Sequence, residues 1–444
     1  MKGQSGPILL RHRAHVARIY PTPEQWAVLN SQGHTARALW NLLHEWYTCR
    51  DGGIARRPSV KEIDRQLRAA RTEPLPGWEW MRELPAQATQ QVLKHYLRAW
   101  DRCRDGATKP PKPKGRSARL AVDVPQGSQL HVGRLSGRWG QVAIPLVGRV
   151  RFRWTRPLPG VSRDCPGRIT GGRLTKDSLG WRISFRIEEP AIDLPPRISH
   201  PIGIDRGVVH TMVLSDGRTL DMPPLLRLGE HRRLRKLELR AARRRTARKP
   251  GMRISNRERR TYEQIATLRA RQARRRRDWL HKQTTDIATR HGLVVLEDLR
   301  IANMTRSARG TVENPGTNVR AKSGLNRSIL AAAWNETERM LAYKCRWNAS
   351  LLVKVDAAYS SRTCASCGEQ ATENRQSRDW FHCATCGHEA QADTNAARVV
   401  LARGLAALSG TAPGHGVAGR GAFADRQAMK RQPPPTAAMA QTLL

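Results

Sequence analysis

Residues Cys364–Ala397 read CASCGEQATENRQSRDWFHCATCGHEAQADTNAA and contain four cysteines with the spacing C-x2-C-x15-C-x2-C. Thiolates in this arrangement form tetrahedral zinc sites. Each cysteine pair is followed by a glycine, which allows a tight turn that brings backbone amides toward the sulfurs. The pattern predicts one structural zinc ion bound by Cys364, Cys367, Cys383 and Cys386, since four protein ligands leave no position open for catalysis.

Other groups in the same stretch carry further expectations. A pair of redox-active C-x2-C motifs is the alternative to zinc, and the glycine after each pair argues against it. His382 and His388 are spare donors that we expect to be structural or to face phosphate groups. Seven residues after the last cysteine, Asp393 begins an Ala, Val and Leu-rich helix predicted to end near Leu408.

The charge of the chain limits its partners. Its 444 residues include 79 Lys and Arg against 37 Asp and Glu, a formal charge of +42. Such a chain repels itself unless a polyanion neutralises it, which favours nucleic acid over an anionic membrane surface as the partner. No apolar run reaches about 18 residues and no signal peptide is evident, so we expect no membrane span. Four cysteines outside the zinc stretch lack any spacing and favour a reducing, cytosolic environment: Cys49, Cys103, Cys165 and Cys345.

The first half of the chain changes its periodicity twice. A short strand at His15–Tyr20 precedes a helix capped by Thr22 and stopped by Asp51-Gly52-Gly53, and a second helix follows Leu84-Pro85. The aromatic residues of these helices could stack on bases, but their helical spacing favours a place in the core. Alternating strands at Arg149–Trp154 and Trp181–Ile187 carry arginine on their outer face. Together these segments predict a small β-barrel interrupted by helices.

The second half predicts an α/β arrangement. An apolar strand holds Asp205, and a hairpin follows with its turn at Ser215–Arg218. Residues 231–277 hold 20 Lys and Arg against 3 acids, which we interpret as helices that track phosphates. Further elements follow in this order: a buried strand Leu293–Leu299, a loop Ser307–Lys322, a helix at 325–347 with Leu330, Trp334 and Leu341 inward, and a strand Leu351–Asp356.

Three acids stand at the ends of these elements: Asp205, Glu297 and Asp393. If the two strands are neighbours, the final helix would lay Asp393 beside them, and three close carboxylates require a cation. Hard oxygen ligands suit Mg²⁺, and two such ions about 4 Å apart support phosphodiester cleavage. Taken singly, each acid is more often a cap or an ion-pair partner. Asp298 fits equally well as a group supporting the metal ligands and as an exposed neighbour.

In this order the motifs are specific to a known family. They are RIYPTPEQ at 18–25, LPAQ at 84–87, GIDRG at 203–207, VLEDL at 295–299, LNRS at 325–328, the two knuckles CASCG and CATCG, and ADTNAA at 392–397. Nearly end to end, the chain resembles the TnpB family of transposon-encoded RNA-guided nucleases and the related compact type V CRISPR effectors. Arg206 is a departure, since many members carry an aliphatic residue there.

The resemblance implies a multidomain α/β protein. It would combine an RNase H-like RuvC nuclease, a zinc-ribbon insertion, and an N-terminal wedge barrel with an inserted helical recognition lobe. Asp205, Glu297 and Asp393 would be the catalytic triad that binds two Mg²⁺ ions. A guide RNA would pair with double-stranded target DNA, and the protein would read a short motif flanking the target. The family resemblance implies a bacterial cytoplasmic protein, associated with the nucleoid when bound to DNA, with no membrane partner.

The same resemblance implies a domain order. It is a first wedge strand at 1–22, the recognition lobe at 23–118, the rest of the wedge at 119–198, the RuvC core at 199–360 with a basic helical insert at 225–290, the zinc ribbon at 361–390, the final RuvC helix at 391–408, and a disordered tail at 409–444. We use "ribbon" below for residues 361–390.

Two other functions remain open from sequence. One is an RNA-guided protein that binds DNA and represses transcription without cutting, and the presence of all three acids favours a nuclease over it. The other is a transposase or transposition accessory protein. No residue distinguishes a transposon protein from a CRISPR effector, and the oligomeric state is equally undetermined.

Overall fold

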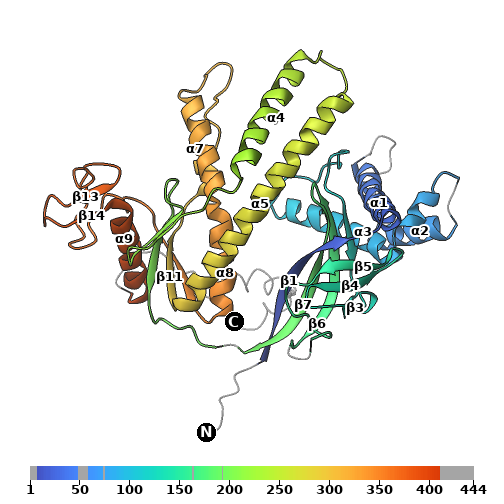
Figure 1. The fold of residues 1–444 in the computed structure, drawn as a ribbon, viewed down its shortest axis with the longest axis horizontal. Helices are drawn as coiled ribbons and strands as arrows, with labels where there is room; N and C mark the ends of the chain where they lie inside the picture. The colour runs from blue at the N-terminus through green and yellow to red at the C-terminus, as the bar shows by residue number, and fades with distance from the viewer. Residues whose placement is uncertain (1–7, 49–58, 74–75, 163–164, 193, 411–444) are drawn as a thin grey trace, which may run out of the picture. The chain divides into compact units, whose positions relative to one another are not determined.

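The structure is a computed structural model that describes residues 8–48, 59–73, 76–162, 165–192 and 194–410 (Figure 1). The chain forms two compact units. The first comprises residues 1–193 and 233–271, and the second comprises residues 194–232 and 272–444. The predicted helix end at residues 51–53, Cys49 and all but the first two residues of the predicted tail lie outside the described residues. Among the residues described, no helix has the length and apolar character needed to cross a membrane.

The first unit contains a seven-stranded antiparallel sheet with the order β2-β6-β7-β1-β5-β4-β3. The long first strand lies at its centre, pairing with β7 along most of its length and with β5 at Ile19 and Tyr20. The three predicted strands are therefore present, but the hydrogen bonding leaves β2 and β3 as edges and does not close a barrel. The strands are β1 (Ile8–Tyr20), β2 (Ala121–Val124), β3 (Val132–Arg134), β4 (Trp139–Ile144), β5 (Gly148–Arg153), β6 (Arg168–Asp177) and β7 (Gly180–Ile192).

Three helices are inserted between β1 and β2: α1 (Pro23–Thr48), α2 (Val60–Thr72) and α3 (Ala86–Arg104). Thr22 caps α1 as predicted, because its hydroxyl accepts from the Gln25 amide at 3.3 Å while the Gln25 side chain accepts from the Thr22 amide at 3.1 Å. Helix α2 was not predicted, whereas α3 is the helix expected after Leu84-Pro85. Inside α1, Gly33 lets the helix approach β2 closely, since a Cβ there would lie 2.8 Å from Leu120 Cβ.

The aromatic side chains of these helices belong to the core of the first unit. Tyr96 is fully buried and makes edge-on ring contacts with Trp40 and Tyr47. On the sheet, the inward residues Trp181 and Phe185 are also fully buried. Packing in the core, rather than base stacking, is what the structure favours for these aromatic residues.

The second unit is built on a five-stranded mixed sheet with the order β10-β9-β8-β11-β12. Strand β8 is parallel to β11, and β11 is parallel to β12, whereas the hairpin strands β9 and β10 run antiparallel. Helix α9 (Ala392–Leu408) covers one face through Val400. The other face packs against two helices, α5 (Asn256–Arg290) through Ile287 and α8 (Trp334–Trp347) through Leu341. The strands are β8 (Ile202–Asp205), β9 (Met212–Leu214), β10 (Thr219–Leu220), β11 (Leu293–Glu297) and β12 (Leu351–Val355).

The predicted basic segment forms two long helices, α4 (Leu228–Ala247) and α5 (Asn256–Arg290), which run side by side in Figure 1. A narrow apolar seam joins them through Leu237, Ala241, Ile265 and Leu268. Because so little of each helix is apolar, most of the arginine side chains face solvent. This hairpin is the strongly cationic element that the sequence indicated.

One predicted helix is wrong in its detail. The segment 325–347 is divided between α7 (Val319–Ala332) and α8 (Trp334–Trp347), preceded by the short α6 (Ile301–Met304). The break is at Ala333, whose φ of 57° is left-handed. Trp334 and Leu341 are buried as expected, but Leu330 is 60% exposed. A single helical period cannot continue through the break, so the residues before it do not share the inward face of α8.

Gly203 tests the packing of α9 on the sheet. A Cβ at Gly203 would lie 2.2 Å from the Ala397 carbonyl oxygen, so we expect Gly203→Ala to lower stability by about 1–3 kcal/mol. Gly324 in α7 has open space around its Cβ position, and Gly324→Ala should stabilise by about 0.5–1 kcal/mol. Thermal unfolding of both variants checks the pair. Equal melting temperatures would contradict the close approach of α9 to β8.

Candidate functional site

Two of the three predicted acids end neighbouring parallel strands. Ile204 of β8 lies opposite Leu296 of β11, so the next residue of each strand, Asp205 and Glu297, stand side by side. Both are largely withdrawn from solvent, and Glu297 is only 5% exposed. Asp393 lies in the first turn of α9, the helix that packs directly on β8. The structure therefore brings together all three acids from segments almost 190 residues apart in the chain.

The electrostatics of this cluster reflect its crowding. Burial, and after it the negative charges of Glu297 and Asp393, together raise the pKa of Asp205 to about 7, against the opposing effects of the Arg206 backbone amide and the charge of Arg375. Burial also raises the pKa of Glu297, against a hydrogen bond from Ser360 and the charges of Arg206 and Arg403. Burial and the charges of the other two acids disfavour ionisation of Asp205, and a nearby divalent cation would offset this effect; the oxygen donors of the acids suit Mg²⁺.

The three carboxylates do not converge on a single point. In the described residues, the four ribbon cysteines form the one group of three or more His, Cys, Asp or Glu ligand atoms close enough to hold an ion together. A wider arrangement of carboxylates is compatible with two ions sharing the ligands.

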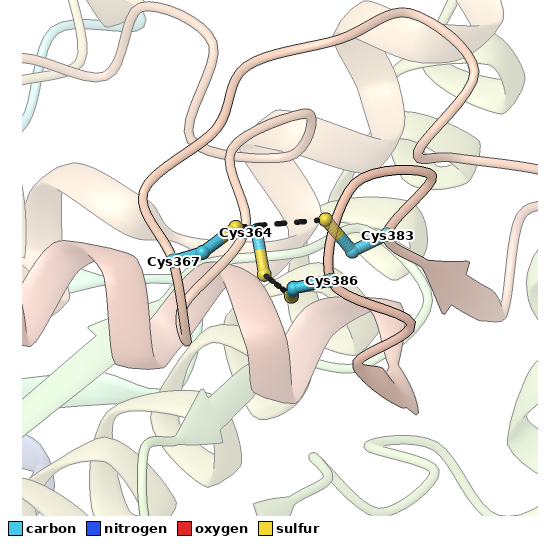
Figure 2. Close-up of side chains that lie close together, drawn as sticks. All are labelled: Cys364, Cys367, Cys383 and Cys386. Atoms are coloured by element: carbon cyan, nitrogen blue, oxygen red, sulfur yellow. Dashed lines mark hydrogen bonds between the residues drawn. The ribbon is translucent and has the colours of Figure 1, made fainter.

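The four ribbon cysteines point toward one another, as Figure 2 shows. Their sulfurs all lie within 4.8 Å, and the pairs Cys364–Cys386 and Cys367–Cys383 are each 3.7 Å apart. A tetrahedral zinc ion with bonds of about 2.3 Å separates its sulfurs by about 3.8 Å, so the cluster fits this ion. Gly368 and Gly387 have φ of 81° and 71°, the left-handed turn expected after each pair.

Backbone amides of the knuckles favour ionised thiols. The Ser366 amide donates to Cys364 Sγ at 3.4 Å. Amides of Cys386 and Thr385 lower the pKa of Cys383 to about 6, although partial burial works against this. Zinc binds the thiolate, so these amides favour the form of Cys383 that the ion needs, whereas hydrogen bonds among the sulfurs raise the pKa of Cys367 and Cys386.

The two ribbon histidines do not join the cysteines. His382 lies on β13 (Trp380–His382) and contacts Glu389 of β14 (Glu389–Gln391) through Nδ1 at 3.1 Å. The ring of His388 packs near Phe381, with 6.5 Å between ring centroids. Both positions agree with the structural alternative given for these side chains.

The ribbon is tied to the acidic cluster by contacts that the sequence did not indicate. Ser360, just before the ribbon, donates to Glu297 Oε1 at 2.7 Å. Asn395, two residues after Asp393, is fully buried; it donates to the Thr363 carbonyl at 2.8 Å and accepts from the Ala365 amide at 3.0 Å. Arg403 of α9 donates to the carbonyls of Asp356 and Ala358. Of the three residues that make these contacts, only Asn395 lies in a motif noted in the sequence, the ADTNAA run.

Asp298 has a different environment from its neighbour Glu297. Its side chain is 60% exposed and pairs with Lys354 at 2.7 Å. The structure thus favours the exposed-neighbour interpretation of Asp298 over a role in supporting metal ligands.

Known proteins with similar sequences identify the family. The chain is 36% identical over 332 residues to "Putative RNA-guided DNA endonuclease InsQ" of Escherichia coli K12, covering 74% of this chain and 77% of that protein. It is 30% identical to a "Putative RNA-guided DNA endonuclease" of Streptomyces pristinaespiralis, covering 89% of this chain and 90% of that protein. The chain belongs to the TnpB family. This agrees with the resemblance found from the motifs.

Family profiles match the TnpB chain in three places. They are described as a helix-turn-helix domain at residues 11–47, a probable transposase at 184–308, and a Cas12f1-like TNB domain at 334–400. The last profile spans α8, β12, the ribbon and the start of α9. The first covers β1 and α1, which in this TnpB protein are a strand and one long helix.

The chain is similar in fold to solved structures, of which one example follows. It is the "Cryo-EM structure of the Cas12f1-sgRNA-target DNA complex", with a TM-score of 0.50 and 16% identity, covering 85% of this chain and 83% of that chain. The similarity supports the multidomain α/β architecture that the sequence predicted.

The raised pKa of Asp205 predicts a stability effect. As the pH rises from 3.8 to 7, the unfolded protein ionises Asp205 before the folded protein does, so folding stability is lost across this window. Asp205→Asn removes that loss, and its stability advantage over the parent protein should grow by about 3 kcal/mol between pH 5 and pH 8.

Urea unfolding in magnesium-free buffer, without chelator so that zinc is retained, measures this difference. Asp298→Asn changes an exposed acid next to the cluster and should show no such growth with pH. An advantage of Asp205→Asn that is independent of pH would contradict the buried, crowded environment of Asp205.

Proposed function

We propose that this chain is an RNA-guided DNA endonuclease that cleaves target DNA at Asp205, Glu297 and Asp393. The observation that carries the proposal is the proximity of Asp205 and Glu297, at the ends of neighbouring strands, to Asp393 on the helix packed against them. The family membership supports it, since two relatives are named RNA-guided DNA endonucleases. The mixed sheet with α9 on one face is consistent with the RNase H-like RuvC fold that the motifs implied.

The acids would hold two Mg²⁺ ions, which would activate water and stabilise the leaving oxygen during phosphodiester hydrolysis. The residues around the acids have separate tasks. Ser360 orients one Glu297 oxygen and leaves the other available as a ligand. The positive charge of Arg375, from the ribbon, acts on Asp205 and is available to offset negative charge brought in by a DNA phosphate.

The charged elements would hold the nucleic acids. The α4–α5 hairpin carries most of the 20 basic residues of positions 231–277 and would grip phosphates by shape and charge rather than by sequence. Guide RNA would supply the sequence choice by pairing with target DNA. The first unit, with its curved sheet and inserted helices, corresponds to the wedge and recognition lobe and would read the short flanking motif.

The test begins with RNA that co-purifies with the protein, which is sequenced and used to design a matched double-stranded target. In Mg²⁺, the complex should cleave this target and leave an unmatched one intact. Asp205→Ala should abolish cleavage while retaining RNA and target binding, whereas Asp298→Ala, next to Glu297 but exposed, should cleave normally. Absence of bound RNA, or cleavage that survives Asp205→Ala, would refute the proposal. Bound target without cleavage would instead support a repressor.

The zinc ribbon gives a separate prediction. Cys383→Ser should release zinc and loosen both the contacts of Asn395 with the first knuckle and the contact of Ser360 with Glu297. Cleavage should therefore fall by a factor of about 10–100, whereas guide RNA affinity should change little, because the acids and not the RNA contacts depend on the ribbon. Zinc content, RNA affinity and cleavage rate are measured on the same sample. Equal loss of RNA binding and cleavage would contradict this role of the ribbon.

A further inference from the structure

Arg206, the residue directly after Asp205, is one of the most deeply buried charged residues described. The residue is 2% exposed, and none of its side chain reaches solvent. Removing a guanidinium from water is costly unless hydrogen bonds and opposite charge replace its hydration. An arginine at this position therefore needs a structural or functional reason.

The guanidinium of Arg206 joins three elements at the acidic cluster. From the end of β8, Nη2 donates to the backbone carbonyl of Glu297 at the end of β11. Nη1 donates to the carbonyl of Trp334 at 3.4 Å and to Glu338 Oε2 at 3.3 Å, both on α8.

Helix α8 returns a hydrogen bond to the same segment. The indole Nε1 of Trp334 donates to the Gly207 carbonyl at 3.1 Å. Trp334 is the first residue of α8 and follows Ala333, the left-handed residue that separates α7 from α8. The two bonds in opposite directions therefore fasten residues 206–207 to a fixed point, the beginning of α8.

The negative charges near Arg206 are those of Glu338 and of two acids of the cluster, Glu297 and Asp205. Burial lowers the pKa of Arg206, and the charge of Glu338, then those of Glu297 and Asp205, oppose this effect. Glu338 also contacts Lys354 at 3.2 Å, so it keeps a cationic partner if Arg206 is removed. Loss of Arg206 would thus release the strand ends without leaving Glu338 unpaired.

We propose that Arg206 is a positioning residue of the nuclease centre, whose guanidinium fixes the ends of β8 and β11 against α8 and thereby sets the separation of Asp205 and Glu297. This inference rests on the proposed function for its effect on cleavage. Its structural half, the fastening of the two strand ends, stands independently of catalysis. Arg206 contacts neither substrate nor metal in this role; it acts through the backbone that carries the two ligands.

The alternative is that Arg206 contributes only to the stability of the fold, through its ion pair with Glu338 and its bonds to the two carbonyls. The two roles differ in their consequences. A purely stabilising residue affects melting temperature and leaves the rate of the folded enzyme unchanged. A positioning residue changes the cleavage rate of protein that is folded and bound to its target, because metal ligands displaced by about 1 Å can cost about 100-fold in rate.

The experiment compares Arg206→Met, Arg206→Lys and a control, Arg218→Met, in the full chain with its co-purified RNA. Arg218, in the β9–β10 turn of the same sheet, also has a part-buried guanidinium, which contacts Asp216 of that turn and His291, the residue after α5. We expect Arg206→Met to lower the single-turnover cleavage rate about 100-fold with unchanged affinity for target DNA. Arg206→Lys should recover part of the rate, since an ammonium can still donate to the Glu297 carbonyl. Arg218→Met should cleave normally.

A second readout does not depend on cleavage. Hydrogen exchange of the RNA-free protein should be faster in Arg206→Met at the ends of β8 and β11 and at the beginning of α8, and unchanged there in Arg218→Met. Lysine should restore part of the protection. If Arg206→Met does not fold, Arg206→Lys carries both measurements, with a smaller loss of rate and protection expected.

The outcomes separate this inference from the proposed function. If the parent protein does not cleave, the proposed function fails, and hydrogen exchange still tests whether Arg206 fastens the strand ends. Normal rate and normal exchange in Arg206→Met would overturn the inference. Equal losses of rate in Arg206→Met and Arg218→Met would also overturn it, because the effect would then be general destabilisation.

Discussion

The parallel pairing of β8 with β11 is the constraint on which the second unit depends. It sets two acids side by side, and the missing side chain of Gly203 lets α9 lie close enough on β8 to add the third. Burial and the charges of the two other acids raise the pKa of Asp205, so its ionisation opposes folding unless a cation offsets the charge. The same geometry that weakens the metal-free protein therefore favours metal binding. The pairing of β8 with β11 and the packing of α9 therefore affect both the stability of the metal-free protein and the proposed catalysis.

The ribbon is an integral part of this arrangement rather than a separate module. Its chain leaves β12 and re-enters at α9, and the fully buried Asn395 connects the helix to the first knuckle. Asn374, also fully buried, accepts from the amide of Ala384 in the second knuckle and donates to the carbonyl of Glu369 beside the first. A metal ion held by the four cysteines would therefore restrain the helix that carries Asp393.

Local patterns in the sequence predicted local structure well. The cysteine spacing predicted the cluster of four sulfurs. The predicted Thr22 cap and the predicted buried strand that ends near Glu297 were both confirmed. The order of the strands suggested which acids lie near one another. Contacts made across long sequence distances were missed. Nothing near Ser360 or Arg206 in sequence indicates Glu297 as their partner, because hydrogen bonds between distant segments leave no periodic signal. Leu330 was misplaced for a related reason, since a single left-handed residue changes the helical phase without a sequence mark.

The position of α9 in the chain has a consequence for synthesis. Two acids and the whole basic hairpin leave the ribosome well before residue 393, yet the cluster is complete only when the last described helix packs on the sheet. A nascent chain, or one shortened by a premature stop or by proteolysis before α9, holds nucleic-acid-binding surfaces but lacks the third carboxylate. Such fragments would keep the basic hairpin without the complete acidic cluster, and under the proposed function they would be unable to cleave DNA.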